Sequence, residues 1–163
     1  MKKILVIDDE QYLTSVLYSI LEKTGLYEVF IANDGQEGID LIKKYNFDLI
    51  FLDYIMPKVR GDKVLQFVRE HSDHKHIKVI IMSGLIDILS NDVVHSKQCE
   101  EAANDVSEDR AGTPSPNIFP IHLIEQYGIQ GVLEKPFARG KLLSLTQTIF
   151  EQEKNGKKKD FNT

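Results

Sequence analysis

Four apolar runs in this sequence each end abruptly at residues that could take part in polar chemistry. These residues are Asp8 and Asp9 after the first run, and Asp53, Ser83 and Lys135 after three later runs. An uninterrupted apolar run is typical of a strand buried on both faces of a parallel sheet. Because parallel strands end on one edge of the sheet, we expect these side chains to lie close together.

Three of these five residues are acids, whose charges must be compensated if they lie close together. Carboxylates about 4 Å apart repel by roughly 4 kcal/mol at an effective dielectric constant near 20, so a cation or a raised pKa is required. Mg²⁺ suits such a site, because it binds through a few carboxylates and leaves positions for phosphoryl oxygens. With Lys135 as a second positive charge and Ser83 as a donor, the set favours a phosphoryl group on Asp53.

The elements that position these residues alternate along the chain. Strands are predicted at residues 3–7, 28–32, 47–53, 78–82 and 131–134, and helices at about 11–24, from 35, at 61–71, in the second half of 118–127 and at about 138–150. Gly25 and Gly128 are suited to end helices, and Met56-Pro57 ends the third strand because proline has no ladder donor. Such alternation predicts an α/β domain with a parallel sheet.

Length and composition limit the class of protein. A chain of 163 residues with a net charge of −5 fits one domain and offers no basic surface for nucleic acid. The single cysteine, Cys99, cannot form an internal disulfide, which favours a reducing compartment. The first apolar run is too short for a signal peptide, and no run approaches the roughly 18 apolar residues of a membrane span. We therefore expect a soluble cytoplasmic protein without direct nucleic-acid binding or membrane insertion.

The ordered set of motifs resembles the receiver domain of two-component response regulators, in particular the stand-alone receivers similar to chemotaxis regulators. The matching motifs are Asp8-Asp9, Asp53 with Met56-Pro57, Gly61, Ser83-Gly84 and Lys135-Pro136-Phe137. The resemblance implies a flavodoxin-like, doubly wound, five-stranded parallel sheet of order 2-1-3-4-5 with helices on both faces. We expect this receiver domain to span residues 1–150, followed by a solvated tail at 151–163.

The resemblance also implies a role for each site residue. Asp53 corresponds to the phosphoacceptor. The ligands of Mg²⁺ would be Asp8, Asp9, Asp53 and the main-chain carbonyl of Ile55. Ser83 corresponds to the hydroxyl that contacts the phosphoryl group, and Lys135 corresponds to the lysine that pairs with it. The Lys135–Pro136 bond is a candidate for the cis form. The implied phosphodonor is a histidine kinase or histidine phosphotransfer protein. The phosphorylated domain would bind an unidentified output protein, and its own chemistry would be limited to self-catalysed transfer and slow hydrolysis.

Two departures from the family pattern affect the expected signalling. Val132 stands where family members commonly carry a tyrosine or phenylalanine that takes part in the two-state readout. An insertion at about residues 85–117, with a candidate helix at 91–104, makes the spacing between Ser83 and Lys135 longer than is usual in the family. Long loops of this kind are uncommon and often functional. The insertion either adds a partner-binding element or covers the surface normally used for output.

Three alternative interpretations concern particular residues. Val132 and the insertion favour a phosphorylation-independent receiver that acts as a protein-interaction module. A phosphohydrolase of the haloacid-dehalogenase type also uses an aspartyl phosphate, but it requires an Asp-x-Asp after the first strand, where this chain has Asp8-Asp9-Glu10. The histidines at 71, 74 and 76 could suggest a metal site, whereas the polar residues around them favour a solvated loop.

Overall fold

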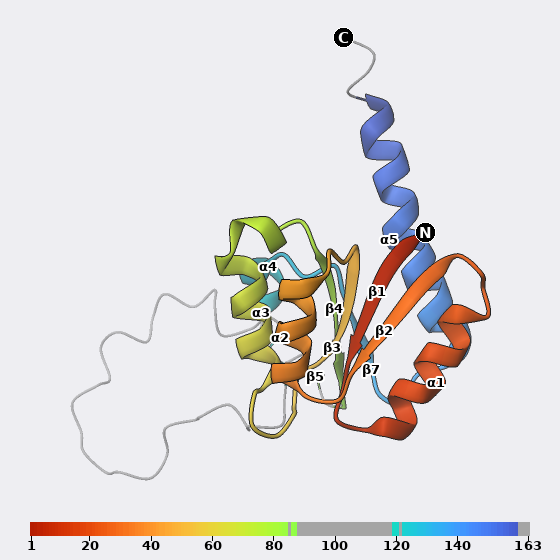
Figure 1. Cartoon of the computed structure of the whole chain (residues 1–163). Coiled ribbons are helices and arrows are strands. Elements are labelled where there is room, and N and C mark those ends of the chain that lie inside the picture. Colours follow the sequence, from red (N-terminus) through yellow and green to blue (C-terminus); the bar gives the residue numbers. More distant parts are fainter. Residues whose placement is uncertain (85, 88–118, 121, 160–163) are drawn as a thin grey trace.

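The computed structural model describes residues 1–84, 86–87, 119–120 and 122–159. Along the chain these residues form β1 (Lys2–Ile7), α1 (Gln11–Glu22), β2 (Tyr27–Ala32), α2 (Gly35–Lys44), β3 (Leu49–Asp53), α3 (Gly61–Glu70), a 3₁₀ turn (Ser72–His74), β4 (Lys78–Ser83), β5 (Ile86–Asp87), β6 (Phe119–Pro120), α4 (Leu123–Tyr127), β7 (Gly131–Glu134) and α5 (Arg139–Lys159) (Figure 1). Apart from β5 and β6, strands and helices therefore alternate as the sequence predicts.

Five of these strands form one sheet in the order β2-β1-β3-β4-β7. All neighbouring pairs in this sheet are parallel. Numbered consecutively within the sheet, the strands have the order 2-1-3-4-5, so the predicted flavodoxin-like fold is confirmed. The strand order reverses between β1 and β3, and open sheets of this type bind ligands outside the carboxyl ends of the strands at that point.

Helices cover both faces of the sheet (Figure 1). α1 and α5 lie on one face, where Leu17 and Leu142 are buried in a common apolar cluster. α2, α3 and α4 lie on the other face, where Ile42 and Val64 belong to a second cluster. Because the sheet is covered on both sides, β3 is buried along its whole length, as its apolar sequence predicts.

Local hydrogen bonds define the ends of two helices. The Asp34 carboxylate accepts the Glu37 N–H at 2.8 Å before α2, and the Glu37 carboxylate accepts the Asn33 N–H at 2.8 Å. The first bond satisfies a donor that the first helical turn leaves free, and the second fixes the residue before the cap to the same turn. At the other end of the domain, Gly128 ends α4 with φ at 56°, in the left-handed region that favours glycine.

The structure differs from the sequence predictions at the last helix and at two short strands. α5 continues to Lys159 and projects beyond the sheet, whereas the prediction ends it near residue 150, where inward-facing apolar residues stop (Figure 1). Glu, Gln and Lys have high helix propensity without packing, and Asn155 and Gly156 are the two poor helix formers in this stretch. β5 and β6 are two-residue strands, too short to give a periodic pattern. The candidate helix at 91–104 lies outside the described residues.

In the part of the chain that the structure describes, no helix combines the length and apolar character needed to cross a membrane.

Gly61 is required where α3 begins against the end of β3. Its N–H donates to the Tyr54 carbonyl at 3.1 Å. A Cβ at this position would overlap the Asp53 carbonyl oxygen and lie 2.8 Å from the Tyr54 Cα. Both are backbone atoms, so a side chain at position 61 forces a shift next to Asp53 itself.

We therefore expect Gly61→Ala to lower the free energy of unfolding by about 1–3 kcal/mol, the usual cost of overpacking. Urea denaturation measures this change. Gly140→Ala is the matched control, because a Cβ on Gly140 in α5 meets nothing within 4 Å. Alanine is the better helix former by up to about 1 kcal/mol, so the control is expected to be neutral or stabilising. Equal losses of stability in the two variants would contradict the steric argument.

Candidate functional site

Acidic side chains and one lysine meet at the edge formed by the carboxyl ends of the sheet strands. One carboxylate oxygen from each of Asp8, Asp9 and Asp53 lies within 4.8 Å of the other two. The Lys135 Nζ is 2.7 Å from the Asp8 Oδ2 and 2.9 Å from the Asp53 Oδ2. The structure thus brings together four residues that the sequence places after three different strands.

Asp8 is fully buried, and both of its carboxylate oxygens have partners. Its Oδ1 accepts the Glu10 N–H at 2.9 Å, and its Oδ2 accepts from the Lys135 ammonium. Its own N–H donates to the Ala32 carbonyl at 3.1 Å, which continues the β1–β2 pairing. Asp9, by contrast, is exposed. The acidic pair therefore combines one rigid carboxylate with one that solvent can reach.

Asp53 is the last residue of β3 and only 7% of its surface is exposed. Its Oδ1 accepts the Ile55 N–H at 3.2 Å, and its Oδ2 accepts from Lys135 at 2.9 Å. The chain then turns away through Met56-Pro57 and through Lys58, whose φ of 63° is left-handed. The loop that ends the strand therefore also fixes the carboxylate of Asp53.

Ser83 and Lys135 are linked through the backbone where β4 and β7 end. The Lys135 N–H donates to the Ser83 carbonyl at 2.8 Å, and the Ser83 side chain is buried. The Lys135–Pro136 bond is cis, as the family resemblance implies. Lys135 therefore leaves the sheet at β7 while its ammonium group reaches the ends of β1 and β3.

The charges at this edge shift the proton affinities of two groups in the same direction. Burial raises the pKa of Asp53, the hydrogen bond from Lys135 opposes this, and the negative charge of Asp8 adds to the increase. Burial alone would lower the pKa of Lys135, but the hydrogen bonds and charges of Asp8 and Asp53 outweigh it and raise that pKa. The lysine therefore stays charged, and one ammonium group does not fully compensate the acids.

The raised pKa of Asp53 predicts that this carboxylate weakens the fold at neutral pH. The folded state keeps a proton on Asp53 at pH values where the unfolded chain has lost it. The contribution of Asp53 to stability therefore falls as the pH rises from the ordinary aspartate pKa through the folded one. Without divalent cations, we expect Asp53→Asn to raise the free energy of unfolding at pH 7, and this gain to shrink toward about pH 3.5, below the ordinary aspartate pKa.

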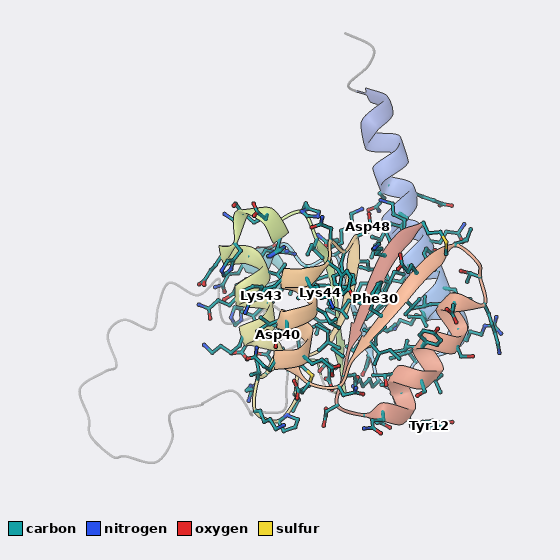
Figure 2. All side chains as sticks on the ribbon, viewed as in Figure 1. Tyr12, Phe30, Asp40, Lys43, Lys44 and Asp48 are labelled. Atoms are coloured by element: carbon teal, nitrogen blue, oxygen red, sulfur yellow. The ribbon has the colours of Figure 1, made fainter. Side chains whose placement is uncertain are left out.

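Urea denaturation at the two pH values checks this expectation. Asp40→Asn serves as the control, because Asp40 lies on the surface of α2, where its carboxylate is 3.6 Å from the Lys43 ammonium and accepts from the Gln36 side chain at 3.1 Å (Figure 2). If Asp53→Asn raised the free energy of unfolding as much at acidic as at neutral pH, the result would contradict a raised pKa of Asp53.

The acidic cluster fits a small, hard divalent cation. Mg²⁺ holds oxygen ligands at about 2.0–2.1 Å, so oxygens on opposite sides of the ion are about 4 Å apart. The carboxylate oxygens of Asp8, Asp9 and Asp53 already lie within 4.8 Å, so small side-chain rotations make them converge. All three donors are carboxylates, which is the chemistry that such an ion prefers. Among the described residues this is the one group of three potential ligands.

The histidines of the α3–β4 connection pack differently. The Phe67 ring lies 4.2 Å from the His71 ring and 5.8 Å from the His74 ring, measured between centroids. His71 Nδ1 also forms a hydrogen bond with the Phe67 carbonyl at 2.9 Å. His71 and His76 are exposed. These residues therefore form a polar surface connection, in line with the loop interpretation.

An aromatic contact beside the site is not evident from the sequence. The Tyr54 ring meets the Phe119 ring edge-on, with centroids 5.0 Å apart and an interplanar angle of 85°. The Arg60 guanidinium lies 5.6 Å from the Tyr54 ring centroid. Val132 is half-buried and packs against the same apolar cluster. The position of Tyr54 directly after Asp53 is the one sequence signal for this contact. Its partner Phe119 lies far along the chain, so the sequence alone does not predict the pair.

A groove between α1 and the start of α5 also adjoins the site. Its volume is about 340 Å³, and it is lined by Glu10, Tyr12, Leu13, Val16, Ile20, Lys135, Pro136, Phe137 and Arg139. Tyr12, in the first turn of α1, is 77% exposed at its edge (Figure 2). Lys135 is therefore shared between the acidic cluster and a mainly apolar surface.

Comparison with known sequences identifies the family. The family model "Response regulator receiver domain" matches residues 4–104, which is more than half of the chain. "Probable transcriptional regulator ycf27" of Porphyridium aerugineum is 38% identical over 87 residues, covering 53% of this chain and 35% of that protein. "Transcriptional regulatory protein CpxR" of Escherichia coli K12 is 41% identical over 70 residues, covering 43% of this chain and 29% of that protein. The chain thus matches about a third of the length of these relatives.

Solved structures agree on the fold. The CheY-like response regulator receiver domain protein from Methanospirillum hungatei JF-1 has a TM-score of 0.66 at 24% identity, over 95% of this chain and 98% of that one. The Francisella response regulator 1452 receiver domain has a TM-score of 0.67 at 23% identity, over 94% and 99% of the two chains. Together with the family match, the fold and the acidic pocket lead to one conclusion: the chain belongs to the response regulator receiver domain family of two-component signal transduction.

Proposed function

We propose that Asp53 accepts a phosphoryl group from the phosphohistidine of a histidine kinase or histidine phosphotransfer protein, and that the modified domain signals through altered binding to an output protein. The observation that carries this proposal is the Lys135 ammonium, which bridges Asp8 and Asp53 at the strand ends. A carboxylate oxygen of Asp53 attacks phosphorus, the bond between phosphorus and the imidazole nitrogen breaks, and the imidazole leaves.

Each neighbouring residue has a part in this transfer. Lys135 moves from the carboxylates to the incoming phosphoryl oxygens, which is a short displacement because its Nζ already touches Asp53. The Ser83 hydroxyl donates to a second phosphoryl oxygen from the end of β4. The Ile55 N–H holds the Asp53 carboxylate in place at 3.2 Å. Phosphoryl transfer depends mainly on positioning and on compensation of charge, and these groups supply both.

Asp8, Asp9 and Asp53 would hold Mg²⁺, with the main-chain carbonyl of Ile55 as a further ligand. When bound, the ion neutralises the charge that develops on the phosphoryl oxygens. Asp8 is suited to this role because hydrogen bonds from Glu10 and Lys135 already orient its carboxylate. The exposed Asp9 leaves room for water on the solvent side.

The groove beside Lys135 supports a protein as phosphodonor. A donor histidine must approach Asp53 along the open edge of the sheet, and the groove offers an apolar surface next to that path. Exposed tyrosines are frequent anchors of protein interfaces, and Tyr12 is exposed at this place. A helix of the donor protein could therefore pack against α1 while its phosphohistidine reaches the acids.

A phosphorylation-independent receiver is the second candidate, and Val132 favours it. In place of an aromatic side chain, position 132 holds a half-buried valine in the apolar cluster beneath α4. Comparing output-protein binding by wild type and Asp53→Asn under phosphorylating and non-phosphorylating conditions separates the two candidates. Equal binding in all four cases would favour the second.

Intact mass spectrometry tests the first proposal directly. The protein is incubated with acetyl phosphate, with and without Mg²⁺, and the modified peptide is then mapped. One added phosphoryl group on Asp53, formed only with Mg²⁺, is the expected result. Folded protein that gains no phosphoryl group under any of these conditions would contradict the proposal.

A further inference from the structure

Tyr54 connects the phosphoacceptor to a distant part of the chain. It follows Asp53 directly, and its N–H donates to the Met82 carbonyl at 3.1 Å, next to Ser83. Its ring meets Phe119, which is fully buried although it lies in a two-residue strand at the return of the inserted segment. Arg60 also lies over the Tyr54 ring, so this ring has two contacts beside the site. The end of β3 is therefore in contact with Phe119 through the Tyr54 ring.

A second connection leads from Ser83 to the same place. β4 ends at Ser83, and β5 begins after only two intervening residues. β5 pairs in parallel with β6, with Ile86 opposite Phe119 and Asp87 opposite Pro120. We call this four-residue pair the neck. One strand of the neck is therefore attached to Ser83, and the other is attached through Phe119 to Tyr54.

We infer that the neck responds to the state of Asp53, with Phe119 as a positioning residue, and that phosphorylation weakens the β5–β6 pairing. This inference rests on the proposed function of Asp53. A phosphoryl group that takes a hydrogen bond from Ser83 draws the end of β4 toward β3, and β5 moves with it. β6 does not follow, because Phe119 stays packed on Tyr54. Two residue pairs are too few to hold the strands together against such a displacement.

The position of Val132 makes this contact more important in this chain. Val132 in β7 pairs with Ile81 and carries no ring that could respond to Ser83. The Tyr54–Phe119 pair instead places two rings within the same apolar cluster, where Tyr54 adjoins the site and Phe119 belongs to the neck. The coupling is reciprocal, because a change in the neck must alter the affinity of the site for its ligand by the same factor.

Hydrogen exchange on the wild-type protein tests the inference without any substitution. The protein is treated with acetyl phosphate and Mg²⁺, and the phosphoryl load is measured by intact mass in the same samples. We expect exchange at the amides of residues 86–87 and 119 to become about tenfold faster in the phosphorylated protein, within the usual range of coupling between sites. The amides of β2, far from Ser83, should be unchanged.

Two variants of Tyr54 separate coupling from simple stability. Tyr54→Phe keeps the ring on Phe119 and should retain the acceleration. Tyr54→Leu removes the ring and should reduce the acceleration of exchange to less than about twofold, because the size of the acceleration depends on the coupling between Asp53 and the neck. A Phe119→Trp variant gives an independent signal, since the chain contains no tryptophan and this indole would be the single one present. Its emission should change on phosphorylation, because β5, which pairs with position 119, moves away while the ring stays on Tyr54.

The outcomes distinguish this inference from the proposed function. A phosphoryl load on Asp53 together with unchanged or slower exchange at the neck overturns the inference and leaves the proposed function intact. The same holds if Tyr54→Leu keeps the full acceleration. Absence of any phosphoryl load on folded protein overturns both. Faster exchange that requires the ring at position 54 supports the inference.

Discussion

Asparagine in place of Asp53 is expected to abolish phosphoryl transfer from acetyl phosphate. The amide has nearly the shape of the carboxylate and can still accept from the Ile55 N–H, but it is not a nucleophile for phosphorus. The loss should therefore be complete although the fold is kept. Intact mass after incubation with donor and Mg²⁺ measures it, and thermal unfolding of the same variant shows whether the fold is intact.

Asp48→Asn is the matched control for this substitution. Asp48 is also partly buried and also accepts from a lysine, with its Oδ1 2.7 Å from the Lys2 Nζ, but it lies at the opposite end of the sheet (Figure 2). This variant should gain one phosphoryl group like the wild type. An adduct of equal yield on Asp53→Asn would mean that another residue is the acceptor, and peptide mapping would then identify it.

Lys135→Met is expected to impair both stability and phosphoryl transfer. The methionine keeps much of the apolar stem but leaves the fully buried Asp8 and the nearly buried Asp53 without their shared cation. Removing one partner of a buried ion pair typically costs about 3–5 kcal/mol, and the remaining exposure of Lys135 lowers our expectation to about 2–4 kcal/mol. Mg²⁺ should restore much of this loss, because it supplies the missing positive charge.

The effect of Lys135→Met on transfer should be a decrease in rate of about 10²- to 10³-fold, typical of a lost group that stabilises developing charge. Time courses of adduct formation at saturating Mg²⁺ measure it. Lys58→Met is the control, since the Lys58 Nζ lies 3.7 Å from Asp34 and its side chain is 78% exposed. That variant should differ from wild type by less than about 0.5 kcal/mol. A Lys135→Met protein of normal stability and rate would contradict the assigned role.

The linear pattern of the sequence is sufficient to predict most of the fold. Continuous apolar runs such as residues 79–82 are typical of strands covered on both faces, and their alternation with amphipathic segments leaves few parallel topologies. The fold in turn predicts that residues following those runs meet at one edge. For this reason the convergence of Asp8, Asp53 and Lys135 could be expected from the sequence, because strand ends are defined by local signals.

The sequence patterns by themselves thus determined the parallel sheet and the edge at which the acids lie, and the family resemblance supplied the strand order. Contacts between distant segments were decided by the tertiary structure. The length of α5 was misjudged because a solvated helix needs no apolar stripe. The neck and the packing of Phe119 on Tyr54 carry no periodic signal, since two-residue strands are too short to show one. The bridge from Lys135 to both Asp8 and Asp53 likewise depends on the path of the chain after β7, and such a path is fixed only when all the strands are packed together.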